Sequence, residues 1–126
     1  MFPFLIVFAG AGFGGALRHG VNLVAARMLG VDFPFGTFAV NVLGSLAMGL
    51  LAGYFAFKGD AAQGWRLFLA TGVLGGFPTF SAFSLDVALL WERGIRHIAA
   101  LYILGSVALS LGALFFGLWL ARSLLS

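Results

Sequence analysis

The sequence predicts an all-α integral membrane protein with four transmembrane helices, the third of which is broken in its middle. Hydrophobic residues fill 62% of the 126 positions and charged residues only 9%, well below the roughly 25% that is typical of soluble domains. Four apolar stretches are each long enough to cross a bilayer, which takes about 20 residues. We therefore expect residues 1–126 to form a single four-helix transmembrane domain.

The four predicted spans follow one another with short connections. The spans cover residues 2–29, 35–57, 65–91 and 98–120, and the connections cover residues 30–34, 58–64 and 92–97. Short connections predict that consecutive helices are antiparallel neighbours. The N-terminus carries no basic region and Arg18 interrupts the first apolar run, so we do not expect a cleaved signal peptide.

The third span contains the most informative stretch, residues 75–81, which read Gly-Gly-Phe-Pro-Thr-Phe-Ser. Glycine and proline disrupt a helix, and proline also removes a backbone donor. Unpaired backbone at membrane depth is tolerated only where it is buried in protein or lines a wet cavity. The stretch therefore predicts a helix break beside a binding or conduction site.

Small residues four positions apart predict close contacts between helices. The pairs with this spacing are Gly10/Gly14, Gly49/Gly53, Gly72/Gly76 and Ser106/Ser110. The chain has 19 glycines, more than four helices need for packing against one another, which favours an oligomer.

The basic residues near the span ends show no orientation bias. One side would carry Lys58, Arg66 and Arg122, and the other Arg27, Arg93 and Arg96. The positive-inside rule orients a membrane protein by an excess of basic residues on one side, so it predicts no preferred orientation here. We expect insertion in both orientations and an antiparallel, dual-topology homodimer in the lipid bilayer. The alternative is that the N-terminus or the acidic residues select one orientation.

Four polar residues from four spans lie at a similar predicted depth, roughly 10–16 Å from the same membrane face. They are Arg18, Asn41, Asp86 and Tyr102. We expect a shared vestibule in which Arg18 attracts anions and Asp86 weakens that attraction, so that a bound anion also leaves. The alternative for Arg18 and Asp86 is a structural ion pair that keeps both side chains from lipid.

A second polar group follows the break. Thr79 and Ser81 supply hydroxyls, and Phe80 and Phe83 share one helix face. Because the edge of an aromatic ring is electropositive, this pair is suited to line an anion path, although ordinary packing is the alternative.

The fourth span carries two serines, Ser106 and Ser110, four residues apart. Residues at this spacing share one helix face, so their hydroxyls would form a ladder of donors along a path. The alternative is a hydrogen bond from each serine to its own helix backbone.

The composition argues against several functions. The absence of cysteine excludes disulfides and thiol chemistry, and two distant histidines, His19 and His97, predict no metal cluster. The sequence contains no pair of a nucleophile and a general base that would indicate an enzyme. Basic residues beside apolar runs fit bilayer anchoring better than nucleic-acid binding.

Three motifs resemble the fluoride channel family, Fluc (CrcB-like). Residues 14–18 read Gly-Gly-Ala-Leu-Arg, residues 36–41 read Gly-Thr-Phe-Ala-Val-Asn, and residues 75–84 read Gly-Gly-Phe-Pro-Thr-Phe-Ser-Ala-Phe-Ser. The likeness extends over the whole chain. It implies a dual-topology homodimer with two pores that exports fluoride passively through the bacterial inner (plasma) membrane and lowers its cytoplasmic toxicity.

The resemblance also assigns residues. It implies that Phe80 and Phe83 are the pore-lining aromatic pair, Asn41 the pore asparagine, Ser110 a pore-wall residue, and Arg18 and Tyr102 vestibule residues. We add Thr79 and Ser81 to the path and Asp86 to the vestibule from the reasoning above.

The resemblance further implies a structural sodium ion at the dimer centre, bound by main-chain carbonyls that here belong to Gly75 and Pro78. The family usually reads Thr-Thr-Phe-Ser-Thr-Phe at the break, and this chain has Pro78 and Ala82 in place of the first and third threonines. Proline keeps its carbonyl, whereas Ala82 lacks a hydroxyl.

Two other functions remain as alternatives. A small multidrug transporter is also a four-span, dual-topology dimer, but it requires a carboxylate in its first span, and here the only deep acid is Asp86 in the third. A non-transporting membrane assembly subunit would explain the glycines but not the polar residues or the break.

Overall fold

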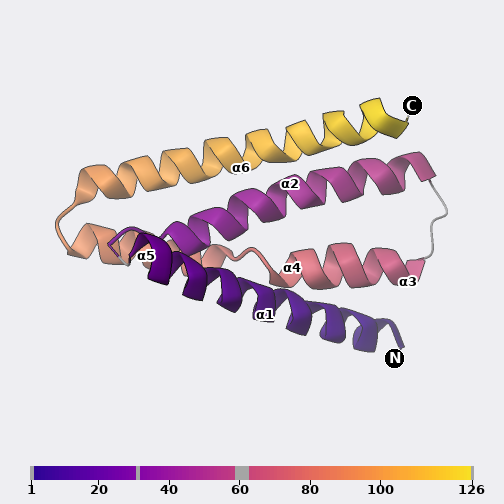
Figure 1. The fold of residues 1–126 in the computed structure, drawn as a ribbon, viewed down its shortest axis with the longest axis horizontal. Coiled ribbons are helices and arrows are strands. Elements are labelled where there is room, and N and C mark those ends of the chain that lie inside the picture. Colours follow the sequence, from indigo (N-terminus) through magenta and orange to yellow (C-terminus); the bar gives the residue numbers. More distant parts are fainter. Residues whose placement is uncertain (1, 31, 59–62, 126) are drawn as a thin grey trace.

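The computed structural model describes residues 2–30, 32–58 and 63–125, and parts of two predicted connections, residues 31 and 59–62, lie outside this range. The elements are α1 (Phe2–Leu29), α2 (Phe35–Lys58), α3 (Gln63–Arg66), the π-helical η1 (Leu67–Val73), α4 (Leu74–Gly76), α5 (Phe80–Glu92) and α6 (Arg96–Leu125). They form four segments long and apolar enough to span a membrane, as predicted. Both chain ends lie at the same end of the bundle (Figure 1).

Two glycines end helices and make the short connections possible. Gly30 (φ +86°) follows α1 and Gly94 (φ +83°) follows α5, both in the left-handed region that favours glycine. At the second turn the Gly94 N–H donates to the Trp91 carbonyl at 3.0 Å and the Ile95 N–H donates to the Leu90 carbonyl at 3.3 Å. These bonds satisfy carbonyls at the end of α5, so α6 starts only a few residues later.

The break in the third span is confirmed and is short. α4 ends at Gly76 and α5 begins at Phe80, and Thr79 between them is extended (φ −150°, ψ 129°). The seven-residue π-helix η1 that precedes the break was not predicted. π-Helical turns are rare and often accompany functional sites, but residue periodicity gives no simple signal for them.

Small residues bring the helices close together along two seams, as predicted for the glycine pairs. In the seam between α1 and η1, a Cβ placed on Gly10 would lie 2.6 Å from the Phe68 carbonyl oxygen and 2.9 Å from the Gly72 Cα. In the seam between α2 and α6, a Cβ on Gly117 would lie 2.6 Å from the Leu46 carbonyl oxygen. These seams are the most extensive helix contacts in the described part of the chain.

Buried apolar side chains occur on several helices, and one cluster of them lies between α5 and α6. Phe83, Leu90, Ala99 and Tyr102 form its centre. Large apolar side chains elsewhere, such as Phe8 on α1 and Phe115 on α6, are mostly exposed in the single chain. This distribution suits a chain whose outer surface contacts lipid or another protein chain.

Candidate functional site

A cavity of about 410 Å³, here called the central cavity, lies against the helix break. It is lined by residues of α2, the break, α5 and α6, namely Asn41, Ser45, Pro78, Thr79, Phe80, Phe83, Ser106, Val107, Ser110 and Leu111. Six residues predicted on an ion path therefore meet in one place, although they come from three spans.

Asn41 holds the broken backbone in place. Its Oδ1 accepts a hydrogen bond from the Thr79 N–H at 3.0 Å, and its Nδ2 lies 3.4 Å from the Thr79 carbonyl oxygen as a donor. The Thr79 hydroxyl in turn accepts the Ala82 N–H at 3.3 Å and so caps the first turn of α5. The sequence predicted Asn41 in the path but not this second, structural role.

The two predicted aromatic residues meet but have different surroundings. The ring centroids of Phe80 and Phe83 are 5.7 Å apart, with their planes at 42°. Phe83 is buried and its ring lies 5.1 Å from that of Tyr102. Phe80 is 78% exposed in the single chain, so its ring is available to an ion or to a second protein chain.

Two serine hydroxyls in the central cavity have no hydrogen-bond partner among the described residues. They are the Oγ atoms of Ser106 and Ser110, and Ser106 is only 4% exposed. The alternative that they bond to their own helix is therefore wrong. Buried polar groups are nearly always satisfied, so these two hydroxyls are available to a ligand, a water molecule or a second protein chain. Ser45 also lines the cavity, and its position four residues after Asn41 was the signal that the sequence analysis missed.

A second cavity, of about 510 Å³, lies on the other side of the break and is here called the Arg18 cavity. Its lining comes from α1 and the start of α5 and consists of Gly15, Arg18, His19, Asn22, Thr79, Ser81, Ala82 and Leu85. The Thr79 and Ser81 hydroxyls are hydrogen-bonded at 3.1 Å. Thr79 lines both cavities, whereas Ser81 lines this one and not the central cavity.

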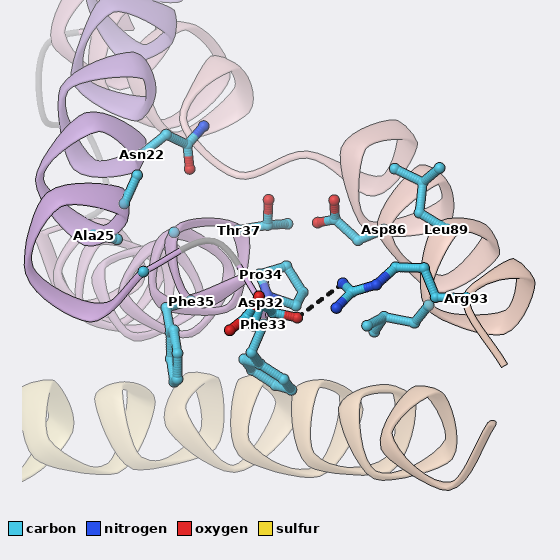
Figure 2. Close-up of a pocket in the computed structure, with 14 residues that line it drawn as sticks. Asn22, Ala25, Asp32, Phe33, Pro34, Phe35, Thr37, Asp86, Leu89 and Arg93 are labelled. Carbon is cyan, nitrogen blue, oxygen red and sulfur yellow. Dashed lines mark hydrogen bonds between the residues drawn. The ribbon is translucent and has the colours of Figure 1, made fainter. Parts of the chain in front are cut away.

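A third cavity of about 290 Å³, here called the end cavity, lies beside the α1–α2 connection. Figure 2 shows Asn22, Thr37 and Asp86 around it, with the Thr37 and Asp86 side chains facing each other. The Arg93 Nη1 donates to the Asp32 carbonyl oxygen at 3.0 Å, which ties the end of α5 to the connection. This cavity therefore has carboxylates as well as a cation in its lining.

The four residues predicted to share one vestibule do not line a common cavity in the single chain. Arg18, Asn41 and Asp86 line three different cavities. Tyr102 is only 1% exposed, and its hydroxyl donates to Asp86 Oδ2 at 3.1 Å. The acid is thus paired with a tyrosine rather than with Arg18. Equal depth does not determine helix rotation, and rotation decides which cavity a side chain faces.

The break also frees backbone carbonyls. The Thr79 N–H that would otherwise reach the Gly75 carbonyl donates to Asn41 instead. The Ala82 N–H that would otherwise reach the Pro78 carbonyl donates to the Thr79 hydroxyl. Gly75 is exposed at the protein surface. Unwound backbone carbonyls of this kind coordinate sodium in membrane proteins, so the residues present fit a sodium ion. The described residues contain no cluster of three or more histidine, aspartate or glutamate side chains that would hold a metal instead.

Comparison with known proteins agrees with this arrangement. Residues 5–118 match the family described as "CrcB-like protein, Camphor Resistance (CrcB)". A Nitrobacter hamburgensis protein named "Fluoride-specific ion channel FluC 2" is 61% identical over 121 residues, which cover 96% of this chain and 98% of the relative. A "Fluoride-specific ion channel FluC" of Methylobacterium nodulans is 67% identical over 104 residues, 82% of this chain and 83% of the relative. The family resemblance seen in the three motifs is confirmed, and the chain belongs to the CrcB-like family.

Proposed function

We propose that this membrane protein is a fluoride-selective ion channel that exports fluoride from the cytoplasm by passive electrodiffusion. The observation that carries the proposal is the pair of buried, unpartnered hydroxyls of Ser106 and Ser110 in the central cavity. The names of relatives with 61% and 67% identity support the choice of ion. A channel performs no covalent reaction, so we assign the chain no enzymatic activity.

The chemistry of the central cavity suits a small, strongly hydrated anion. Such an ion must exchange its water shell for several short hydrogen bonds, and the serine hydroxyls and the Asn41 amide are donors. The ring edges of Phe80 and Phe83 add weak positive potential. The lining contains no charged side chain, so no single site binds the ion too tightly for it to leave.

The two alternative functions explain fewer of these features. A proton-coupled drug exporter needs an acid in its first span, and α1 contains none. An assembly subunit needs no buried hydroxyls without partners. The chain also carries no ATP-binding motif, and passive flow is the simpler mechanism.

The test of this function is ion efflux from proteoliposomes. We expect purified protein to release trapped fluoride and to retain chloride, each followed with an ion-selective electrode. Phe80→Ile should slow fluoride efflux about tenfold because it removes an electropositive ring edge from the path. Phe115→Ile, which changes an exposed ring of α6 outside the central cavity, is the matched control. Equal release of both ions would refute the proposal.

We further propose that two copies form an antiparallel dimer in the bacterial inner membrane, joined by a sodium ion at the Gly75 and Pro78 carbonyls. The support is the balanced basic residues and the carbonyls freed at the break. Because the chain lacks cysteine, Glu92→Cys provides a single label site near the end of α5. An impermeant thiol reagent should label about half of the copies in sealed vesicles, and replacing sodium by an organic cation should slow efflux. Complete labelling, or none, would exclude dual topology.

A further inference from the structure

Ser45 brings a third serine hydroxyl to the central cavity, from a different helix than the other two. It belongs to α2 and follows Asn41 by four residues, whereas Ser106 and Ser110 belong to α6. Residues four apart share one helix face, so each of these two helices presents a pair of polar residues to the cavity.

The packing of α2 on α6 places Ser45 level with Ser110. The two helices run side by side in the same direction (Figure 1). One turn beyond the two serines the helices touch, because a Cβ on Gly49 would lie 3.0 Å from the Leu114 carbonyl carbon. Gly49 and Leu114 do not line the cavity. The cavity therefore closes where the helices meet, and Ser45 and Ser110 lie together at that end.

This end of the cavity lies near the middle of the membrane. Ser45 is ten residues from either end of the apolar span Phe35–Phe55, and Ser110 is 14 residues from either end of the span Arg96–Leu124. The cost of taking an ion out of water is large in an apolar medium. Hydrogen-bond donors at this depth therefore contribute strongly to the passage of an anion.

The other polar groups of the central cavity are already engaged. Asn41 bonds both the N–H and the carbonyl of Thr79, which leaves one amide N–H. The Thr79 hydroxyl accepts the Ala82 N–H and shares a hydrogen bond with Ser81. A dehydrating anion needs several donors at once, so the serines are the groups that can supply them.

We propose that Ser45 is a further anion-binding residue of the path and that its hydroxyl, together with that of Ser110, binds a partly dehydrated small anion at the middle of the membrane. The inference rests on the proposed channel function. A serine hydroxyl donates one hydrogen bond and carries no charge, so it replaces a water molecule of the ion without holding the ion too tightly to leave.

The test compares Ser45→Thr with Ser45→Val in fluoride efflux from proteoliposomes. The two new side chains have nearly the same shape and are both β-branched, so only the hydroxyl differs. We expect efflux through Ser45→Val to be about five to ten times slower than through Ser45→Thr, the effect of one hydrogen bond to a charged group. The matched control pair is Ser84→Thr and Ser84→Val, at an exposed serine of α5 outside the central cavity. The members of this pair should conduct equally.

Equal efflux through Ser45→Thr and Ser45→Val would overturn this inference alone and would mean that the hydroxyl bonds only its own helix. The same difference within the Ser84 pair would overturn it too. If Ser45→Val does not elute like wild type in size-exclusion chromatography, Ser45→Ala gives the decision, since it removes the hydroxyl and adds no volume. Wild-type protein that releases no fluoride would refute the proposed function instead.

Discussion

Asn41→Asp should reduce fluoride efflux by a factor of about 100 or more. The aspartate keeps an oxygen that accepts the Thr79 N–H, so the broken backbone stays anchored. It replaces an amide donor with a negative charge on the wall of the central cavity. Two like charges about 4 Å apart repel by about 4 kcal/mol at the effective dielectric constant of a partly buried site. Fluoride efflux from proteoliposomes measures the effect.

The matched control is Asn22→Asp, which makes the same chemical change outside the central cavity. Asn22 lies between the Arg18 cavity and the end cavity, where Asp86 already supplies a negative charge. We expect this variant to lose less activity than Asn41→Asp. Both proteins should elute like wild type in size-exclusion chromatography. Unchanged efflux in a correctly folded Asn41→Asp protein would remove Asn41 from the path.

Gly117→Leu should strongly destabilise the folded protein. A Cβ at this position would lie 2.6 Å from the Leu46 carbonyl oxygen and 2.8 Å from the Leu50 nitrogen. Both atoms are backbone of α2, so no side-chain rearrangement relieves the collision and α6 must move away. Overpacking typically costs about 1–3 kcal/mol and sometimes more, and we expect about 3 kcal/mol here. The seam between α2 and α6 supports one wall of the central cavity, so efflux should be lost as well.

Gly112→Leu is the control on the same helix, since a Cβ at Gly112 meets nothing within 4 Å in the single chain. The yield of monodisperse protein in detergent and its thermal transition compare the two variants. We expect Gly112→Leu to retain the wild-type helix packing and Gly117→Leu to aggregate or unfold at a lower temperature. Equal stability of the two variants would contradict the close α2–α6 seam.

Much of the fold follows from local features of the sequence. The four apolar stretches predicted the spans, and α1 has the predicted bounds, Phe2–Leu29. The break was predictable because Pro78 lacks a backbone donor wherever it stands. α6 extends beyond the predicted 98–120 to Arg96–Leu125, since charged residues such as Arg122 continue a helix outside the apolar region. The π-helix before the break went unpredicted because its contacts with α1 are tertiary.

The sequence by itself determined which four segments are long and apolar enough to span a membrane, where the third span breaks, and which polar residues and aromatic pair accompany the break. Only the tertiary structure decided how these groups are shared among cavities. It showed that Asn41 accepts a hydrogen bond from the Thr79 backbone N–H and that the Tyr102 hydroxyl donates to Asp86. It also showed that Ser45 lines the central cavity and that Ser81 lines the Arg18 cavity. The physical reason is that hydrophobicity and proline act locally along the chain, whereas helix rotation depends on how glycine seams such as that of Gly117 bring distant backbones into contact.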